Sequence, residues 1–202
     1  GRGLGPFIYV YDDLPGKIFQ IGRGSLDLKI IPAVKESLHE AGTLEANSGI
    51  GPALSFARAY ASRFLEENRR VLIVQLSKSK TPLSYFQIGG EGWKDLVTRM
   101  NLAMNTEGEN RVVAFLFHHA EENIRLSDLE RPDAITSLSY SINLEQMFRE
   151  FRSRFDKSDS PILIGMPLDS WNIKSLYKPM FIESLVSVAG GLFNAQVVFT
   201  EG

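Results

Sequence analysis

Short apolar runs that alternate with helical patterns restrict the fold of this chain more than any other feature of its sequence. Five runs rich in β-branched and aromatic residues are predicted to be buried strands. They are Phe7–Tyr11, Val71–Leu76, Val112–Phe117, Ile162–Met166 and Gln196–Thr200. Before the second run and between the last four runs, apolar residues recur at the spacing of amphipathic helices. The helices predicted in this way span 52–65, 93–104, 144–155 and 177–188.

This order of elements defines the fold class. Strands that alternate with helices of this length are joined by parallel crossover connections. The sequence therefore predicts an α/β protein, a three-layer α/β/α sandwich with a mostly parallel, five-stranded, flavodoxin-like sheet. Its 202 residues suit a single domain over 1–202. The stretch from Asp12 to Gly49 lacks strong periodicity and is predicted to be an irregular excursion over the carboxyl end of the sheet.

Composition narrows the range of partners and chemistry. The net charge of −2 gives no reason to expect nucleic acid or an anionic membrane as a partner. No apolar run approaches the roughly 18 residues that cross a bilayer. The chain has no cysteine, which excludes disulfides, thiolate catalysis and cysteine-ligated metals. The compartment stays open, because secreted proteins can lack cysteine too.

A hydrophobic strand that ends in ionisable residues marks the candidate site. The apolar segment Phe115–Phe117 is followed directly by the polar segment His118–Asn123. Ligands of open α/β sheets bind just outside the carboxyl ends of the strands, so we expect functional residues here. His118 and His119 are consecutive and should point to opposite faces, which disfavours a metal held by both. No metal or other cofactor is predicted.

Five segments resemble, in the same order along the chain, the sialic-acid-type O-acetylesterases, a carbohydrate esterase branch of the SGNH (GDSL) hydrolases. Lys17–Arg23 is similar to a strand-like segment of that family, and Gly49–Ala59 is similar to its Gly-Val-Gly-Pro turn and helix. Ser77–Leu83 falls where the family has a Ser-Gly-Gly-Thr loop. His119–Asn123 falls where it has Gln-Gly-Glu-Ser-Asp, and Val197–Gly202 resembles the strand before its last catalytic motif.

The catalytic motifs that the resemblance implies do not occur in this sequence. It contains neither the Gly-Gln-Ser-Asn-Met nucleophile motif nor the Asp-x-x-His motif that supplies the base. Two interpretations of the nucleophile stay open. Either Gly1-Arg2-Gly3 is the end of a block whose serine lay upstream, or Asp12–Gly16 replaces the nucleophile turn. Without the serine and the base, no activated alcohol is available to attack an acetyl ester.

The positions that surround the implied catalytic centre are altered as well. Ser79 and Lys80 stand at two glycine positions, where we expect the freedom to adopt a positive φ to be lost. In the block at the strand end, His119 replaces glutamine and Ala120 replaces glycine. Glu121 is retained, whereas Glu122-Asn123 replaces Ser-Asp. A neutral imidazole at position 119 could still donate one hydrogen bond.

The candidate site is therefore the rim of a former active site. Its predicted residues are Ser79, Lys80, Thr81, His119, Ala120 and Glu121, with Gly49 and Gly51 as a supporting turn and Trp171 as a residue on which a ligand could stack. The simpler alternatives are a solvated loop for Lys80, core packing for Trp171, and one histidine at the core edge with the other in solvent.

Retained framework motifs with altered catalytic positions favour a catalytically inactive domain. It would serve as a glycan-binding module or as a structural part of a larger assembly, such as a viral or phage particle. The implied partner is an acetylated or acidic glycan, or other protein subunits. The alternative is an active carbohydrate O-acetylesterase of which this chain is a fragment. A third interpretation is an unrelated flavodoxin-like binding domain, for which the fold alone gives no function.

Overall fold

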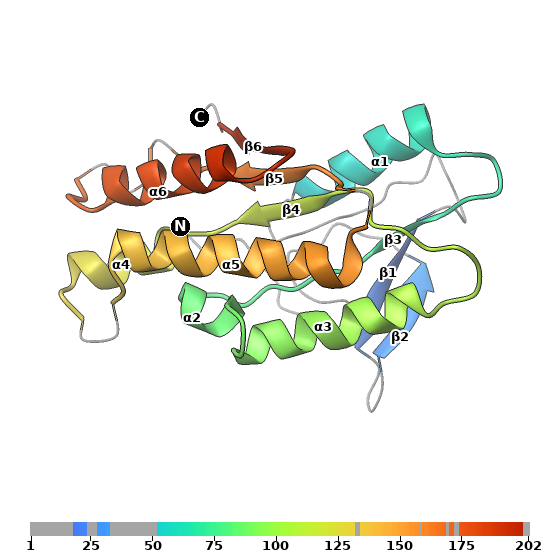
Figure 1. Ribbon diagram of the computed structural model, residues 1–202, viewed down its shortest axis with the longest axis horizontal. Helices are drawn as coiled ribbons and strands as arrows, with labels where there is room; N and C mark the ends of the chain where they lie inside the picture. Colours follow the sequence, from blue (N-terminus) through green and yellow to red (C-terminus); the bar gives the residue numbers. More distant parts are fainter. Residues whose placement is uncertain are drawn as a thin grey trace. The chain divides into compact units, whose positions relative to one another are not determined.

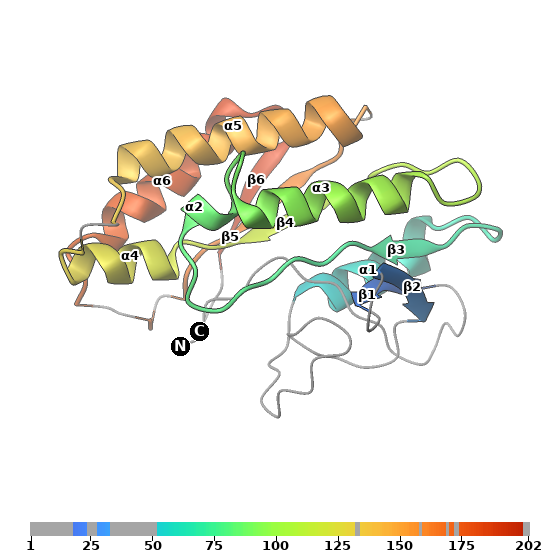
Figure 2. The same ribbon diagram turned by 90° about the horizontal axis from the view of Figure 1, so that it is seen from below.

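The structure is a computed structural model, shown in two views (Figures 1 and 2). It describes residues 18–23, 28–32, 52–131, 134–157, 159–168, 170–171 and 174–199, with the backbone alone for 18–23, 28–32 and two positions early in the first helix. The predicted strand Phe7–Tyr11 and the predicted supporting turn at Gly49 and Gly51 lie outside the described residues.

The chain divides into two compact units, which are described separately here. The first unit comprises residues 1–5, 78–94 and 108–202, and the second comprises 6–77 and 95–107. Helix α3 (Glu91–Met104) contributes residues 91–94 to the first unit and the rest to the second. Whether the whole chain behaves as the predicted single domain stays a prediction.

The second unit contains a three-stranded sheet in the order β2-β1-β3. Strand β1 (Ile18–Arg23) pairs antiparallel with β2 (Leu28–Pro32) and parallel with β3 (Val71–Ile73). Helix α1 (Pro52–Phe64) buries alanines at a four-residue spacing, namely Ala53, Ala57 and Ala61. The expectation of irregular structure from periodicity is wrong for β1 and β2, because main-chain pairing stabilises extended structure there. The strand-like segment that the resemblance indicated at Lys17–Arg23 agrees with β1.

The first unit contains a parallel sheet in the order β4-β5-β6 (Figure 1). Its strands are β4 (Phe115–His118), β5 (Ile162–Gly165) and β6 (Ala195–Val198). Helices α5 (Ser137–Phe155) and α6 (Lys178–Gly191) pack on each other, and α6 packs on β6. Phe115 and Phe117 both place their rings edge-on against Phe148 of α5, so this face of the sheet carries the core.

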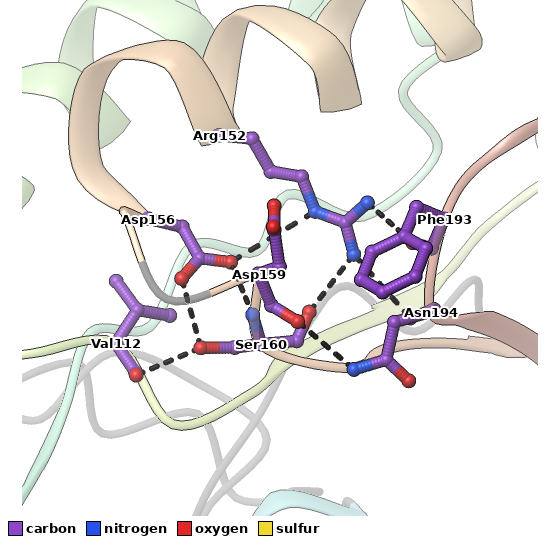
Figure 3. Close-up of polar contacts among 7 residues, drawn as sticks. All are labelled: Val112, Arg152, Asp156, Asp159, Ser160, Phe193 and Asn194. Atoms are coloured by element: carbon purple, nitrogen blue, oxygen red, sulfur yellow. Dashed lines mark hydrogen bonds and ion pairs between the residues drawn. The ribbon is translucent and has the colours of Figure 1, made fainter.

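A polar cluster joins the amino ends of these three strands (Figure 3). Arg152 of α5 donates to the carbonyl oxygens of Ser160, Phe193 and Asn194, which precede β5 and β6. The Asp156 carboxylate accepts from the backbone N–H of Ser160 at 2.8 Å. The Ser160 hydroxyl lies 2.8 Å from the carbonyl oxygen of Val112, before β4. Side chains thus satisfy main-chain groups at the end of the sheet opposite to the candidate site.

Two short helices lie near the carboxyl end of β4, one before this strand in the sequence and one directly after it. They are α2 (Leu83–Phe86) and α4 (Glu121–Asp128), and neither was predicted. The α/β class and the parallel crossovers are confirmed, and the architecture agrees with a three-layer sandwich. The five-stranded sheet is not confirmed, since the described strands form two sheets of three strands each. None of the helices in the described ranges is long and apolar enough to cross a membrane.

Candidate functional site

The carboxyl end of β4 is joined to the Ser79–Thr81 loop by the side chain of His119. Its Nε2 lies 2.9 Å from the carbonyl oxygen of Thr81. A carbonyl oxygen only accepts hydrogen bonds, so Nε2 carries the proton. Nδ1 lies 3.2 Å from the hydroxyl of Tyr140. The neutral tautomer with Nε2–H therefore satisfies both contacts, with Tyr140 donating to Nδ1.

Burial favours this neutral tautomer. Both His119 and Tyr140 are buried, and burial lowers the pKa of His119 from its ordinary value of 6.5. The hydrogen bond to Thr81 and the charge of Glu121 act in the opposite direction, as smaller contributions to the pKa of His119. Burial also raises the pKa of the Tyr140 hydroxyl well above 10.0, so this group remains an O–H donor at neutral pH.

A second hydrogen bond joins the start of α2 to the segment His119–Asn123. The backbone N–H of Leu83, the first residue of α2, donates to Oδ1 of Asn123 at 2.9 Å. Asn123 is fully buried, and its Nδ2 has no hydrogen-bond partner within the described part of the chain. His119 and Asn123 together fix the main chain on both sides of Pro82.

Two non-glycine residues adopt backbone conformations that favour glycine at the positions where the resemblance implies glycine. Lys80 has φ 54°, and Ala120 has φ 134° with ψ −25°. The expectation that a side chain would abolish the positive φ is therefore wrong. The surrounding contacts hold these conformations despite a steric cost of about 1–3 kcal/mol each. The main chain therefore keeps the conformation expected for glycine at these two positions, although the residues are lysine and alanine.

His118 lies on the opposite side of β4 from His119, as strand alternation predicts. Its Nε2 lies 3.2 Å from the carbonyl oxygen of Met166. Its Nδ1 lies 3.4 Å from Oε1 of Glu121, and both side chains are 12% exposed. Within the described ranges, no three histidine or carboxylate side chains are grouped so that they could hold a metal.

The outer part of the rim is formed by exposed polar residues. Ser79 and Lys80 are exposed, and the Thr81 hydroxyl donates to the carbonyl oxygen of Ser79 at 3.0 Å. The Lys78 ammonium lies 4.1 Å from the ring centroid of Tyr85 in α2. These positions leave the Lys80 ammonium in contact with solvent, and two lysines flank Ser79 along the chain.

Trp171 belongs to the loop that follows β5, and its main chain is held by a buried lysine. Nζ of Lys178 donates to the carbonyl oxygens of Leu168 at 2.8 Å and Trp171 at 2.7 Å. The Trp171 side chain is partly exposed. None of the described hydrogen bonds links Trp171 to the residues around His119, so its role in ligand stacking stays a prediction.

The structure brings part of the predicted rim together and adds residues that the sequence did not indicate. His119 contacts Thr81, Ala120 is the N-cap residue of α4, and Glu121 faces His118. Sequence reasoning missed Tyr140, which fills an apolar position of α5 and carries no motif. It also missed Asn123 as the partner of Leu83. A polar group on an otherwise apolar helix face was the available signal for Tyr140.

The fold and this geometry define an α/β protein with its candidate site at the carboxyl end of a parallel strand. The model of the family described as "Carbohydrate esterase, sialic acid-specific acetylesterase" matches residues 21–187, and the chain belongs to this family. An X-ray structure of a protein from Arabidopsis thaliana is similar in fold, with a TM-score of 0.67 and 19% sequence identity. The similarity covers 90% of this chain and 68% of that protein. None of the curated proteins compared with the chain matches it.

Proposed function

We propose that this chain is a carbohydrate-esterase-type domain that by itself does not hydrolyse esters and that binds an acetylated or acidic glycan at the rim. The observation that carries the proposal is the use of both ring nitrogens of His119. Nε2 donates to Thr81 and Nδ1 accepts from Tyr140, so in this conformation neither nitrogen is available as a base or as an oxyanion donor.

His118 does not replace the absent base in this proposal. A histidine base needs one nitrogen free to take a proton from a nucleophile or from water. In His118, Nε2 contacts the carbonyl oxygen of Met166 and Nδ1 faces the carboxylate of Glu121. The described imidazoles therefore act as structural links between β4, β5 and the Ser79–Thr81 loop.

The surface chemistry of the loop supports a negatively charged or ester-bearing ligand. Lys80 is exposed and held in a turn, and the ammonium of Lys78 lies near the ring of Tyr85. An ammonium group offers donors to a carboxylate or to an acetyl carbonyl oxygen. Glycans that carry sialic acid present both of these acceptors.

Hydrolysis is tested by incubating the chain with the methyl glycoside of an O-acetylated sialic acid and measuring the acetate released. We expect release equal to that of a protein-free control. Release well above that control, at a rate proportional to protein concentration, would contradict the inactive assignment.

Binding is tested by calorimetric titration with the same glycoside. We expect Lys80→Ala to weaken binding about tenfold, because a hydrogen bond to a charged group contributes about 1.5 kcal/mol. Lys157→Ala is the matched control, since Lys157 is an exposed lysine between α5 and β5. Equal affinities for the two variants would exclude Lys80 from the binding surface.

The second candidate function is an active O-acetylesterase in which further segments supply the serine and the base. The positive φ of Lys80 and of Ala120 favours it, because the main chain keeps the path that glycines would give. The test is to express the whole open reading frame and to repeat the acetate assay. Activity that is lost when an encoded Gly-Gln-Ser-Asn serine is replaced by alanine would establish this candidate over the first.

A further inference from the structure

We propose that Tyr140 is a positioning residue for the rim, acting through His119. The hydroxyl of Tyr140 selects the tautomer of His119 whose Nε2–H holds the Thr81 carbonyl, and so fixes the Ser79–Thr81 loop. The inference deepens the proposed function and rests on it for the role of the loop in ligand binding. The series of hydrogen bonds from Tyr140 through His119 to Thr81, called the relay below, is a property of the fold.

The tautomer follows from the chemistry of the two outer groups. Thr81 offers only a carbonyl oxygen to Nε2, at 2.9 Å, and a neutral imidazole has only one N–H. Nδ1 must then accept, and the Tyr140 hydroxyl at 3.2 Å is the group that donates to it. With the other tautomer, two acceptors would face each other between Nε2 and Thr81.

Aromatic rings keep the imidazole in the orientation that this relay requires. Phe86 meets the His119 ring edge-on, with 5.4 Å between the ring centroids. The rings of Phe117 and Tyr140 lie at 5.9 Å and 6.1 Å. A rotation of the imidazole about χ2 would move both nitrogens away from their partners and would press the ring against these neighbours.

Tyr140 is itself held by the helices of the first unit. It lies in the first turns of α5, where its backbone N–H donates to the carbonyl oxygen of Thr136. Its ring meets Phe181 of α6 edge-on at 5.1 Å. The position of the rim loop therefore depends on the packing of α5 against α6, although neither helix carries a predicted rim residue.

Glutamine at position 119 can reproduce the same relay. Its side-chain NH₂ can donate to Thr81 while its oxygen accepts from Tyr140, and glutamine has no alternative tautomer. The resemblance to the O-acetylesterases places glutamine at this position. His119→Gln is therefore a conservative variant that should keep the loop in place, whereas His119→Leu should release it.

The test compares Tyr140→Phe, His119→Gln and His119→Leu with the wild type by NMR and by titration. Tyr177→Phe, at an exposed tyrosine that is the N-cap residue of α6, is the control. In the wild type at pH 7, ¹⁵N shifts should identify Nε2 as protonated and Nδ1 as unprotonated. In Tyr140→Phe, the Nδ1 shift and the amide signals of Ser79 and Lys80 should move. They should not move in Tyr177→Phe.

The binding measurement uses the methyl glycoside of an O-acetylated sialic acid. We expect Tyr140→Phe and His119→Leu to weaken binding about 2- to 10-fold, the range for one neutral hydrogen bond, and His119→Gln to bind within about twofold of the wild type. A wild-type Nδ1–H tautomer, or loop amide signals unmoved in Tyr140→Phe, would overturn the inference. Absence of binding to the wild type would overturn the proposed function instead, and the NMR result would still decide the relay.

Discussion

The imidazole of His118 occupies the space that a side chain at position 165 would need. The two residues are paired across β4 and β5, and a Cβ built on Gly165 would lie 2.7 Å from Cδ2 of His118. Gly165→Ala should displace the ring from the carbonyl oxygen of Met166 and from Glu121. We expect the free energy of unfolding to fall by about 1–3 kcal/mol, as in other overpacked sites, measured by urea denaturation.

The control for this prediction is the same substitution without the ring. In a His118→Ala background the added methyl group meets no imidazole, so Gly165→Ala should change the free energy of unfolding by less than about 1 kcal/mol. A cost that is equal in both backgrounds would show that His118 is not the reason for glycine at position 165.

The conformation of Ala120 predicts that glycine at this position stabilises the protein. A φ of 134° is strained for any residue with a Cβ, and Ala120→Gly would relieve that strain. The loss of a buried methyl group opposes the gain by about 0.8 kcal/mol. We expect a net increase of about 1 kcal/mol in the free energy of unfolding, visible as a higher urea midpoint.

Ala189→Gly provides the comparison for Ala120→Gly. Ala189 is also buried but lies within α6, where glycine costs about 1 kcal/mol relative to alanine. The two substitutions should thus change stability in opposite directions. A loss of stability at both positions would mean that Ala120 is not strained.

The buried, neutral His119 makes stability depend on pH in one direction. Its pKa is lowered in the folded protein, so below about pH 6.5 the unfolded chain binds a proton that the folded protein does not. The free energy of unfolding should therefore be highest above that pH and should fall as the pH decreases toward the folded pKa. His119→Gln should remove this contribution. Parallel stability curves for wild type and variant between pH 7 and about pH 5 would contradict it.

The cluster at the amino ends of the strands predicts a large difference between two arginines of α5. Arg152 is mostly buried and donates to three backbone carbonyl oxygens, whereas Arg154 pairs with Glu150 at the surface. We expect Arg152→Ala to lower the free energy of unfolding by about 2–4 kcal/mol, because three backbone carbonyl oxygens lose a charged donor and the buried Asp156 carboxylate loses its ion-pair partner. Arg154→Ala should cost under about 1 kcal/mol. Thermal unfolding of both variants checks the difference, and similar costs would contradict it.

Sequence periodicity predicted the elements whose stability comes from an amphipathic or fully apolar pattern. The helices now seen as α1, α3, α5 and α6 lie where apolar residues recur at helical spacing. Helices α2 and α4 have 4 and 8 residues and could not be predicted in this way. Such short helices depend on tertiary contacts, here the bond between Leu83 and Asn123, and not on their own periodicity.

The sequence predicted which residues follow the strand end but not how they are used. His119 was expected as a possible donor, and the structure shows the acceptor, Thr81, in a segment 38 residues away. No local sequence pattern connects these two positions. The sequence around Tyr140 predicts only a residue packed in the core. The φ of Ala120 was equally hidden, because alanine gives no sign of a conformation that glycine normally adopts.

The direct test of the whole account is acetate release from the O-acetylated sialoside by the purified chain, with an active esterase as positive control. Because His119 is committed to Thr81 and Tyr140, we predict a rate equal to that of the protein-free sample. A rate above that of the protein-free sample that is abolished by His119→Leu, in a variant that remains folded, would show that this imidazole takes part in chemistry and would contradict the account.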